Sequence, residues 1–164
     1  MAKETIPIAG PTDAQSIAED LQVRSRDCLL RGDLAGFADC YAVPSTIDCL
    51  SGALPVTSHE DMVEFFEAVR EYFFRSNVGD LSCRVLEASF RDEDTISTSH
   101  EARLVTNEML CLKPYPVYWV IRRQEGVWRV VYAQFAIPLP MRWGAAGRAL
   151  AAQEREALGD LHSA

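Results

Sequence analysis

The chain has 164 residues, of which 48% are hydrophobic and 24% charged, and its formal net charge at pH 7 is -8. This composition is typical of one globular domain, and no apolar run approaches the ~20 residues that span a bilayer. The basic residues are scattered along an acidic chain, so binding to nucleic acid or to an anionic membrane surface is not expected.

The two ends of the chain are predicted to lie outside the folded domain. Residues 1–11 form a flexible N-terminal arm without the apolar segment of a signal peptide, so a cytoplasmic location is expected. Residues 12–140 form a single domain. Residues 141–164 form an alanine-rich C-terminal tail, which is predicted to be helical from about Ala145 to Leu158.

Two helices are predicted near the N-terminus. Residues Thr12 to Gln15 form a capping box, in which the threonine hydroxyl and the glutamine side chain satisfy free backbone amides. Gly32 suits the left-handed position that ends a helix, and Asp33 can cap the next one. The second helix then covers residues 34–42, and Pro44 is expected to stop it.

A short hairpin and a long helix are predicted next. Residues 45–57 carry strand-forming side chains on both sides of a Ser-Gly turn, which indicates a hairpin or a bent strand. Ser58 and Asp61 then form a second capping box at the start of a third helix. Its apolar residues recur at spacings of three and four, which predicts one broad buried face. This face consists of Met62, Phe65, Phe66, Val69, Tyr72 and Phe73.

After Asp80 the apolar period changes to two, which predicts strands. Two strands cover residues 81–90 and 95–107, and a looser stretch with two prolines follows at 108–116. A hairpin then joins residues 117–123 to residues 127–137. Helices first and strands last favour an α+β fold with the helices on one face of a curved antiparallel sheet.

This order resembles the nuclear transport factor 2-like (NTF2-like) superfamily in its cystatin-like α+β cone form. The SnoaL-like and steroid-isomerase-like branches are the most similar. The segments that carry the resemblance are LLRGDLAGFADCYA, SHEDMVEFFEAVREYF, the two long hairpins and GVWRVVYAQF. The resemblance implies three N-terminal helices on a curved sheet, a pocket between them and frequent dimerisation. The superfamily contains enzymes and non-catalytic modules, so the fold does not specify a function.

His100 is the first candidate for a catalytic residue. Strand alternation places it on the more apolar face of residues 95–107, where it would point into the hollow between sheet and helices. An imidazole there could transfer a proton, and the alternative is a hydrogen-bonded core histidine. Steroid-isomerase-like sites use a second acid on the long strands. Glu101 is predicted on the face opposite His100, so this sequence departs from the steroid-isomerase pattern.

Asp48 is the second candidate for a catalytic residue. Resembling enzymes often place a pocket carboxylate in this region. In an apolar hollow the pKa of such a carboxyl would be raised, and the group could serve as a base. The alternative is a solvated carboxylate at a strand edge or turn.

Seven aromatic and aliphatic side chains are candidates for the lining of a ligand pocket. Tyr41 and Tyr118 could donate hydrogen bonds to a ligand, and the alternative for each is a core aromatic residue. Trp128, Val130, Tyr132 and Gln134 are predicted to share one face of the last strand. The full set is Tyr41, Phe65, Phe66, Val69, Tyr118, Trp128 and Tyr132.

Three functional hypotheses remain open. The first is a cofactor-independent lyase, isomerase or hydrolase that acts on a small apolar organic molecule through His100 and Asp48. The second is a non-catalytic module that binds such a ligand or dimerises. The third is a structural subunit resembling the small (beta) subunit of aromatic-ring-hydroxylating dioxygenases.

Cofactors and partners are predicted from the same patterns. No HxH, HExxH or glycine-rich phosphate loop occurs, so no metal and no cofactor is expected. Both faces of the strand at residues 117–123 are largely apolar. One face covers the core, and the other is predicted to form a homodimer through the sheet.

Overall fold

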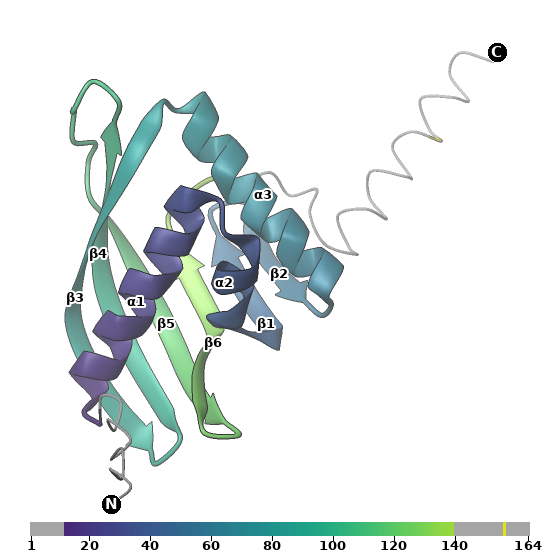
Figure 1. Cartoon of the computed structure of the whole chain (residues 1–164), viewed down its shortest axis with the longest axis vertical. Helices are drawn as coiled ribbons and strands as arrows, with labels where there is room; N and C mark the ends of the chain where they lie inside the picture. Colours follow the sequence, from purple (N-terminus) through teal and green to yellow (C-terminus); the bar gives the residue numbers. More distant parts are fainter. Residues whose placement is uncertain (1–11, 140–155, 157–164) are drawn as a thin grey trace, which may run out of the picture.

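The structure is a computed structural model, and it describes residues 12–139 and Glu156. Three helices cover one face of a curved six-stranded sheet, as predicted (Figure 1). The predicted N-terminal arm and the predicted C-terminal helix lie outside the described residues, apart from Glu156. The elements are α1 (Ala14–Arg31), α2 (Leu34–Asp39), β1 (Tyr41–Cys49), β2 (Gly52–Val56), α3 (His59–Arg75), β3 (Val78–Asp92), β4 (Thr95–Thr106), β5 (Tyr115–Gln124) and β6 (Val127–Phe135).

The strands are arranged in the order β2-β1-β6-β5-β4-β3. The predicted hairpins are all present, so β3 to β6 form an antiparallel meander and β1 pairs with β2. The sheet is mixed rather than wholly antiparallel, because β1 also pairs in parallel with β6, with Ile47 opposite Ala133. This parallel pair places β1 and β2 beside α2 and α3 (Figure 1).

The first two helices begin and end at cap residues that differ in part from the prediction. The N-cap of α1 is Asp13 rather than Thr12, since its carboxylate accepts from the Ser16 amide at 2.8 Å. Gly32 adopts the predicted left-handed conformation, with a φ of 76°. Asp33 caps α2 as predicted by accepting from the Gly36 amide at 2.9 Å.

The end of the second helix was predicted wrongly. Helix α2 ends at Asp39, and Tyr41 already belongs to β1, so Pro44 lies inside a strand and stops no helix. The reason is tertiary. The Cys40 carbonyl accepts from the Val130 amide at 2.9 Å, and the Asp39 carbonyl accepts from Arg129 at 3.0 Å. Hydrogen bonds from β6 therefore replace those that would have continued the helix.

Helix α3 has the predicted cap and the predicted buried face. The Ser58 hydroxyl accepts from the Asp61 amide at 3.1 Å, and the Asp61 carboxylate accepts from the Thr57 amide and hydroxyl. All predicted apolar positions of α3 are buried except Tyr72, which is half-buried. The aromatic residues of this face belong to the hydrophobic core between the helices and the sheet.

Several register shifts interrupt the sheet and change which side chains face the helices, and the β-bulges at Leu86 and Val131 are two of them. In β3 the pairing with β4 shifts between Val85 and Glu87, so Leu86 is an extra residue. In β6, Val130 pairs with Ile121 and Tyr132 pairs with Val120, so Val131 is extra. Because of this second bulge, the predicted common face of Trp128, Val130, Tyr132 and Gln134 is wrong. The first two side chains point towards the helices, and the last two point away.

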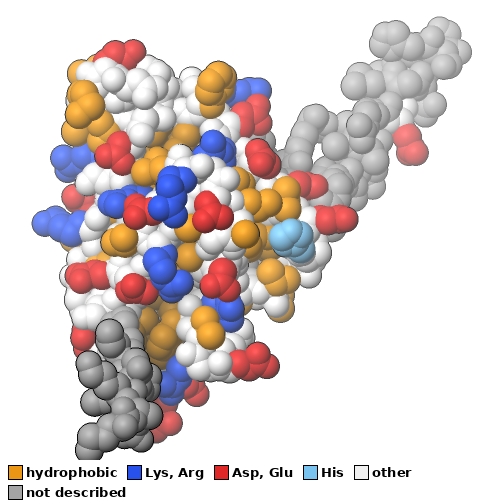
Figure 2. Space-filling view, in the orientation of Figure 1, with side chains coloured by type: hydrophobic (Ala, Val, Ile, Leu, Met, Phe, Trp, Pro, Cys, Tyr) orange, Lys and Arg blue, Asp and Glu red, His pale blue; other side chains and the backbone are white. Residues whose placement is uncertain are grey.

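The surface on the helix side carries basic and acidic side chains interspersed with one another (Figure 2). No helix within the described ranges combines the length and the apolarity that a membrane span needs.

Candidate functional site

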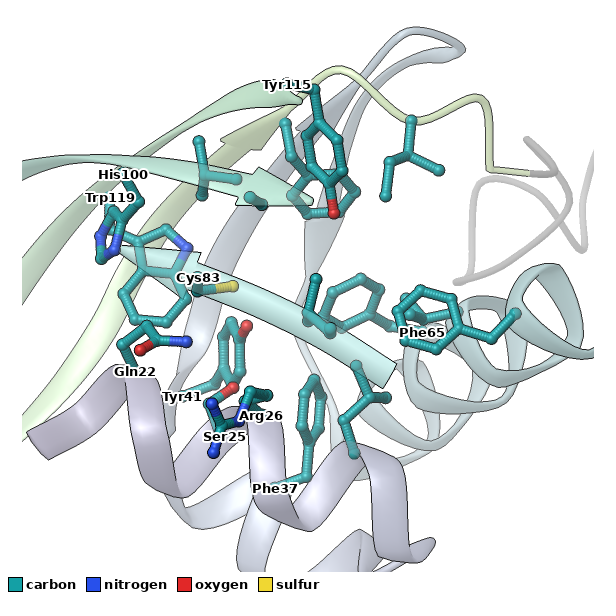
Figure 3. Close-up of a pocket in the computed structure, with 18 residues that line it drawn as sticks. Gln22, Ser25, Arg26, Phe37, Tyr41, Phe65, Cys83, His100, Tyr115 and Trp119 are labelled. Atoms are coloured by element: carbon teal, nitrogen blue, oxygen red, sulfur yellow. The ribbon is translucent and has the colours of Figure 1, made fainter. Parts of the chain in front are cut away.

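A cavity of about 80 Å³ lies between α1, α3 and the concave face of the sheet (Figure 3). Its wall is mostly apolar, because the buried faces of the helices and the inward side chains of β3 to β6 meet there. The apolar wall includes Leu29, Phe37, Phe65, Val69, Phe73, Ala102, Val117, Trp119 and Phe135. A smaller polar set consists of Gln22, Ser25, Arg26, Tyr41, Cys83, His100 and Tyr115.

His100 lies in this cavity wall, on the predicted face of β4. Its side chain is only 2% exposed and stands beside the Trp119 indole, with 4.7 Å between the ring centroids. Burial lowers the pKa of His100 from its ordinary value of 6.5 to about 4. The imidazole is therefore neutral at physiological pH.

Two pairs of hydrogen-bonded side chains border the cavity on the α1 side. Tyr41 is bonded to Ser25, and Cys83 is bonded to Gln22. Burial raises the pKa of the Cys83 thiol to about 11 and raises the pKa of both Tyr41 and Tyr115. These groups are neutral at physiological pH, so the charge nearest the cavity belongs to Arg26, whose guanidinium also binds Asp27 at 2.7 Å.

The structure does not bring Asp48 together with His100. Alternation along β1 points Ile47 towards the helices and Asp48 away from them, onto the convex face of the sheet. There the Asp48 carboxylate accepts a hydrogen bond from the Tyr132 hydroxyl at 3.0 Å. The two residues predicted as a catalytic pair are thus separated by the thickness of the sheet, because their strands present them on opposite faces.

The seven predicted ligand-binding residues are divided among four places. Tyr41, Phe65 and Val69 line the cavity. Phe66 is buried behind it, where its ring packs against Phe37 at 5.2 Å. Trp128 lies at the start of β6, where the centroid of its ring is 6.1 Å from that of Phe90.

The remaining two predicted ligand-binding residues lie on the convex face. The Tyr118 hydroxyl accepts from Arg91, and the Tyr118 and Tyr132 rings meet edge to face at 6.3 Å. With Asp48, Ser99 and Gln134, Tyr118 also borders an open groove on this face. Tyr118 and Tyr132 therefore belong to a polar-aromatic surface outside the cavity.

Several cavity residues were missed by the sequence analysis. Gln22 and Ser25 lie on the buried face of α1, one turn after Ala18 and Leu21, so helical periodicity could have found them. Cys83 lies two positions after Leu81 in β3, and both side chains point inwards, so strand alternation could have identified Cys83 as well. Tyr115 lies in the segment whose prolines argued against a strand, so its place in the cavity wall could not be anticipated.

Within the described ranges, no cluster of three or more His, Cys, Asp or Glu side chains is arranged to hold a metal ion. The polar groups of the cavity instead suit hydrogen bonding to an uncharged molecule. The half-buried Glu101 carboxylate pairs with Arg84 and Arg103 on the other side of the sheet.

No protein-family model and no curated protein matches the sequence. Solved structures do share its fold. A cystatin-like domain of unknown function from Nostoc punctiforme has a TM-score of 0.62 at 13% identity, covering 92% of this chain and 98% of that one. An NTF2-like protein of unknown function from Shewanella oneidensis has a TM-score of 0.59 at 10% identity, covering 74% and 97%.

A third similar structure is a ketosteroid isomerase-like protein from Erwinia carotovora. Its TM-score is 0.54 at 14% identity, and the match covers 74% of this chain and 94% of that one. At these identities the likeness establishes the fold, and the function has to be argued from the cavity.

Proposed function

We propose that this chain, whose fold is the NTF2-like α+β cone, binds a small, mostly apolar organic molecule in the cavity between its helices and sheet. The observation that carries the proposal is an apolar cavity bordered by a few polar side chains, the usual composition of ligand sites. A volume of about 80 Å³ is well below the ~300–1,000 Å³ of pockets for drug-sized ligands. The ligand is therefore about as large as a five-membered ring.

Binding without chemistry is the function that the side chains support best. A general base works best when its pKa lies near the operating pH, and burial holds the pKa of His100 at about 4. Asp48 lies on the other face of the sheet and takes no part at the cavity. Proton transfer by His100 alone is the second candidate, favoured by the position of its ring in the cavity wall, and it would require a substrate with an unusually acidic proton.

The expected result of a direct test is that furan, an apolar five-membered ring, binds in the cavity. In a titration followed by NMR, the methyl signals of Val69 and Val117 should shift in the wild-type protein. Ala102→Leu should abolish these shifts, because Ala102 lines the cavity and the larger side chain occupies its volume. Ala53→Leu, at an exposed position of β2, is the matched control. Equal shifts in wild type and Ala102→Leu would contradict the proposal.

We also propose that the chain forms a homodimer through the convex face of its sheet. On β5, Trp119 and Ile121 are buried towards the helices, whereas Tyr118 and Val120 are half-buried on the convex face. The Arg91–Tyr118 and Asp48–Tyr132 hydrogen bonds hold two aromatic rings in place on that face. Two aromatic rings held in place beside Val120 suit a contact in which the same surface of two copies meets.

Size-exclusion chromatography with light scattering should therefore give the mass of a dimer for the wild-type protein. Val120→Glu should shift it to a monomer, because the substitution places a carboxylate of each copy at the centre of the contact. Val23→Glu is the matched control, since Val23 is an exposed valine of α1, on the other side of the molecule. A monomer mass for the wild-type protein at micromolar concentration would refute the dimer.

A further inference from the structure

The open groove on the convex face of the sheet is larger than the cavity and has a more polar lining. Its volume is about 330 Å³, within the ~300–1,000 Å³ of sites for small organic molecules. Four neighbouring strands supply its floor. Ser99 of β4 pairs with Tyr118 of β5, and Tyr118 pairs with Gln134 of β6. Gln134 in turn pairs with Asp48 of β1. Since paired residues on neighbouring strands point to the same face, these side chains form one row across the sheet.

One end of the groove is apolar and lies near the end of the sheet. Leu50, Pro116 and Ala136 line it there, and all three are exposed. Along β5 the groove extends from Tyr118 to Pro116, whereas Val120 lies beyond Tyr118 in the opposite direction. The groove therefore lies beside the centre of the proposed dimer contact. A ligand can place an apolar group at this end while its polar group meets the row of side chains.

The charge of the groove comes from Asp48. Among the described residues that line the groove, Asp48 is the one with a charged side chain. Its half-buried carboxylate accepts from the Tyr132 hydroxyl at 3.0 Å, which holds it in place. A carboxylate has about four lone-pair sites, so it can accept further hydrogen bonds, and the side chains of Gln134 and Ser99 offer further acceptor oxygens. A ligand that is positively charged and carries several donors is complementary to this lining.

The Tyr118 ring adds an aromatic wall to the same row. It is half-buried, its hydroxyl accepts from Arg91, and its ring meets that of Tyr132 edge to face at 6.3 Å. Arg91 itself does not line the groove. The face of an aromatic ring attracts a cation. Tyr118 and Asp48 lie two strands apart, which corresponds to about 9.5 Å between their backbones and leaves space for an ammonium group between them.

We propose that this groove binds a small organic ammonium ion, a protonated primary amine that carries an apolar group. The ammonium group donates to the Asp48 carboxylate and to the Gln134 side-chain oxygen, beside the Tyr118 ring. The apolar group lies against Leu50 and Pro116. The formal net charge of -8 favours the approach of a cation, and a ligand carboxylate is disfavoured because it would face that of Asp48. This site is separate from the cavity, so either can bind a ligand without the other.

Phenethylammonium and phenethyl alcohol are the matched probes for this inference, since they differ only in their polar group. In NMR titrations at pH 7.5, phenethylammonium should shift the backbone amide signals of Ser99 and Gln134. It should bind about tenfold more tightly than the alcohol, the lower end of the range for hydrogen bonds to a charged group. Asp48→Asn should abolish this preference, because it removes the charge and keeps an acceptor for Tyr132. Glu67→Gln, which removes one charge at an exposed position of α3, should retain it.

Salt tests the same inference without any substitution. The affinity of phenethylammonium should fall about twofold or more between ~20 and ~300 mM NaCl, because salt screens its attraction to the carboxylate, and that of the alcohol should not. Equal affinity of the two probes for wild type, a preference that survives in Asp48→Asn, or equal salt dependence would each overturn the inference. Shifts of the Val69 methyl signals in place of those of Ser99 and Gln134 would place the ammonium ion in the cavity and overturn it as well.

Discussion

Replacement of Phe37 by alanine is expected to lower the free energy of unfolding by about 3–5 kcal/mol, the range for removing a buried aromatic ring. Phe37 is 2% exposed, and its ring contacts those of Tyr41, Phe66 and Phe65 at 4.9, 5.2 and 5.7 Å. It therefore joins α2 to both β1 and α3. Its loss leaves a void in the part of the core where three elements meet.

Urea unfolding at pH 7.5 measures this effect as a lower midpoint with an unchanged slope. Phe74→Ala is the matched control, because Phe74 is 87% exposed on α3 and its removal should change the free energy of unfolding by less than about 0.5 kcal/mol. A loss below about 1 kcal/mol for Phe37→Ala would contradict the aromatic cluster as the centre of the core.

The elements with a strong internal period were predictable from sequence. The face of α3 that carries Phe65 and Val69 repeats every three or four residues, and only a helix buries such a pattern on one side. In β4, Ile96, Ala102 and Leu104 share one face with His100, so the inward direction of His100 followed from its neighbours alone. In both elements a single period extends over the whole length and no irregular residue interrupts it.

The errors arose where tertiary contacts decide the local structure. Residues 40–42 resemble a helix end, but backbone hydrogen bonds from β6 bring them into the sheet. The bulge at Val131 reverses alternation between Trp128 and Tyr132, and a sequence pattern of period two contains no sign of it. Asp48 is different, since the buried side chains of Ile47 and Cys49 on either side already indicated that it points outwards.

The choice among functions depends on the cavity side chains and could not be made from the fold. The same cone can contain a catalytic site, a binding site or a purely structural core, and the pattern that predicts the fold is shared by all three. The hypothesis of a dioxygenase-type structural subunit stays a prediction for this reason. The hydrogen bond between the His100 ring and the Thr98 hydroxyl is a local feature that sequence alone does not show, because the pairing of β3 with β4 shifts beside it at Leu86.

The second large effect expected is an acid destabilisation that depends on His100. Burial lowers its pKa in the folded protein from 6.5 to about 4, whereas the unfolded chain keeps the ordinary value. Between these two pH values the unfolded state binds a proton that the folded state does not, so the stabilisation present above pH 6.5 is lost as the pH falls towards 4. The shift corresponds to about 3 kcal/mol over that window.

Few other groups near the ring titrate in this window. The other titratable side chains that line the cavity are Arg26 of α1, Tyr41 of β1, Cys83 of β3 and Tyr115 of β5. The arginine stays charged, and burial raises the pKa of the other three, so all remain in one form between pH 4 and pH 7. The carboxyls of Asp13 and Asp92 have pKa values lowered from 3.8, so their contributions are lost mainly at lower pH.

Urea unfolding of wild type and His100→Phe at a series of pH values from 7.5 to 4.5 isolates the contribution of the imidazole. The wild-type free energy of unfolding should fall more steeply with acid, by up to about 1.4 kcal/mol per pH unit relative to the variant. His59→Phe should follow the wild type, because that ring is exposed. Parallel curves for wild type and His100→Phe would mean that the ring is protonated as readily in the folded protein as in water. A ring that charges so readily would have to contact solvent, which would contradict the burial of His100 between the sheet and the helices.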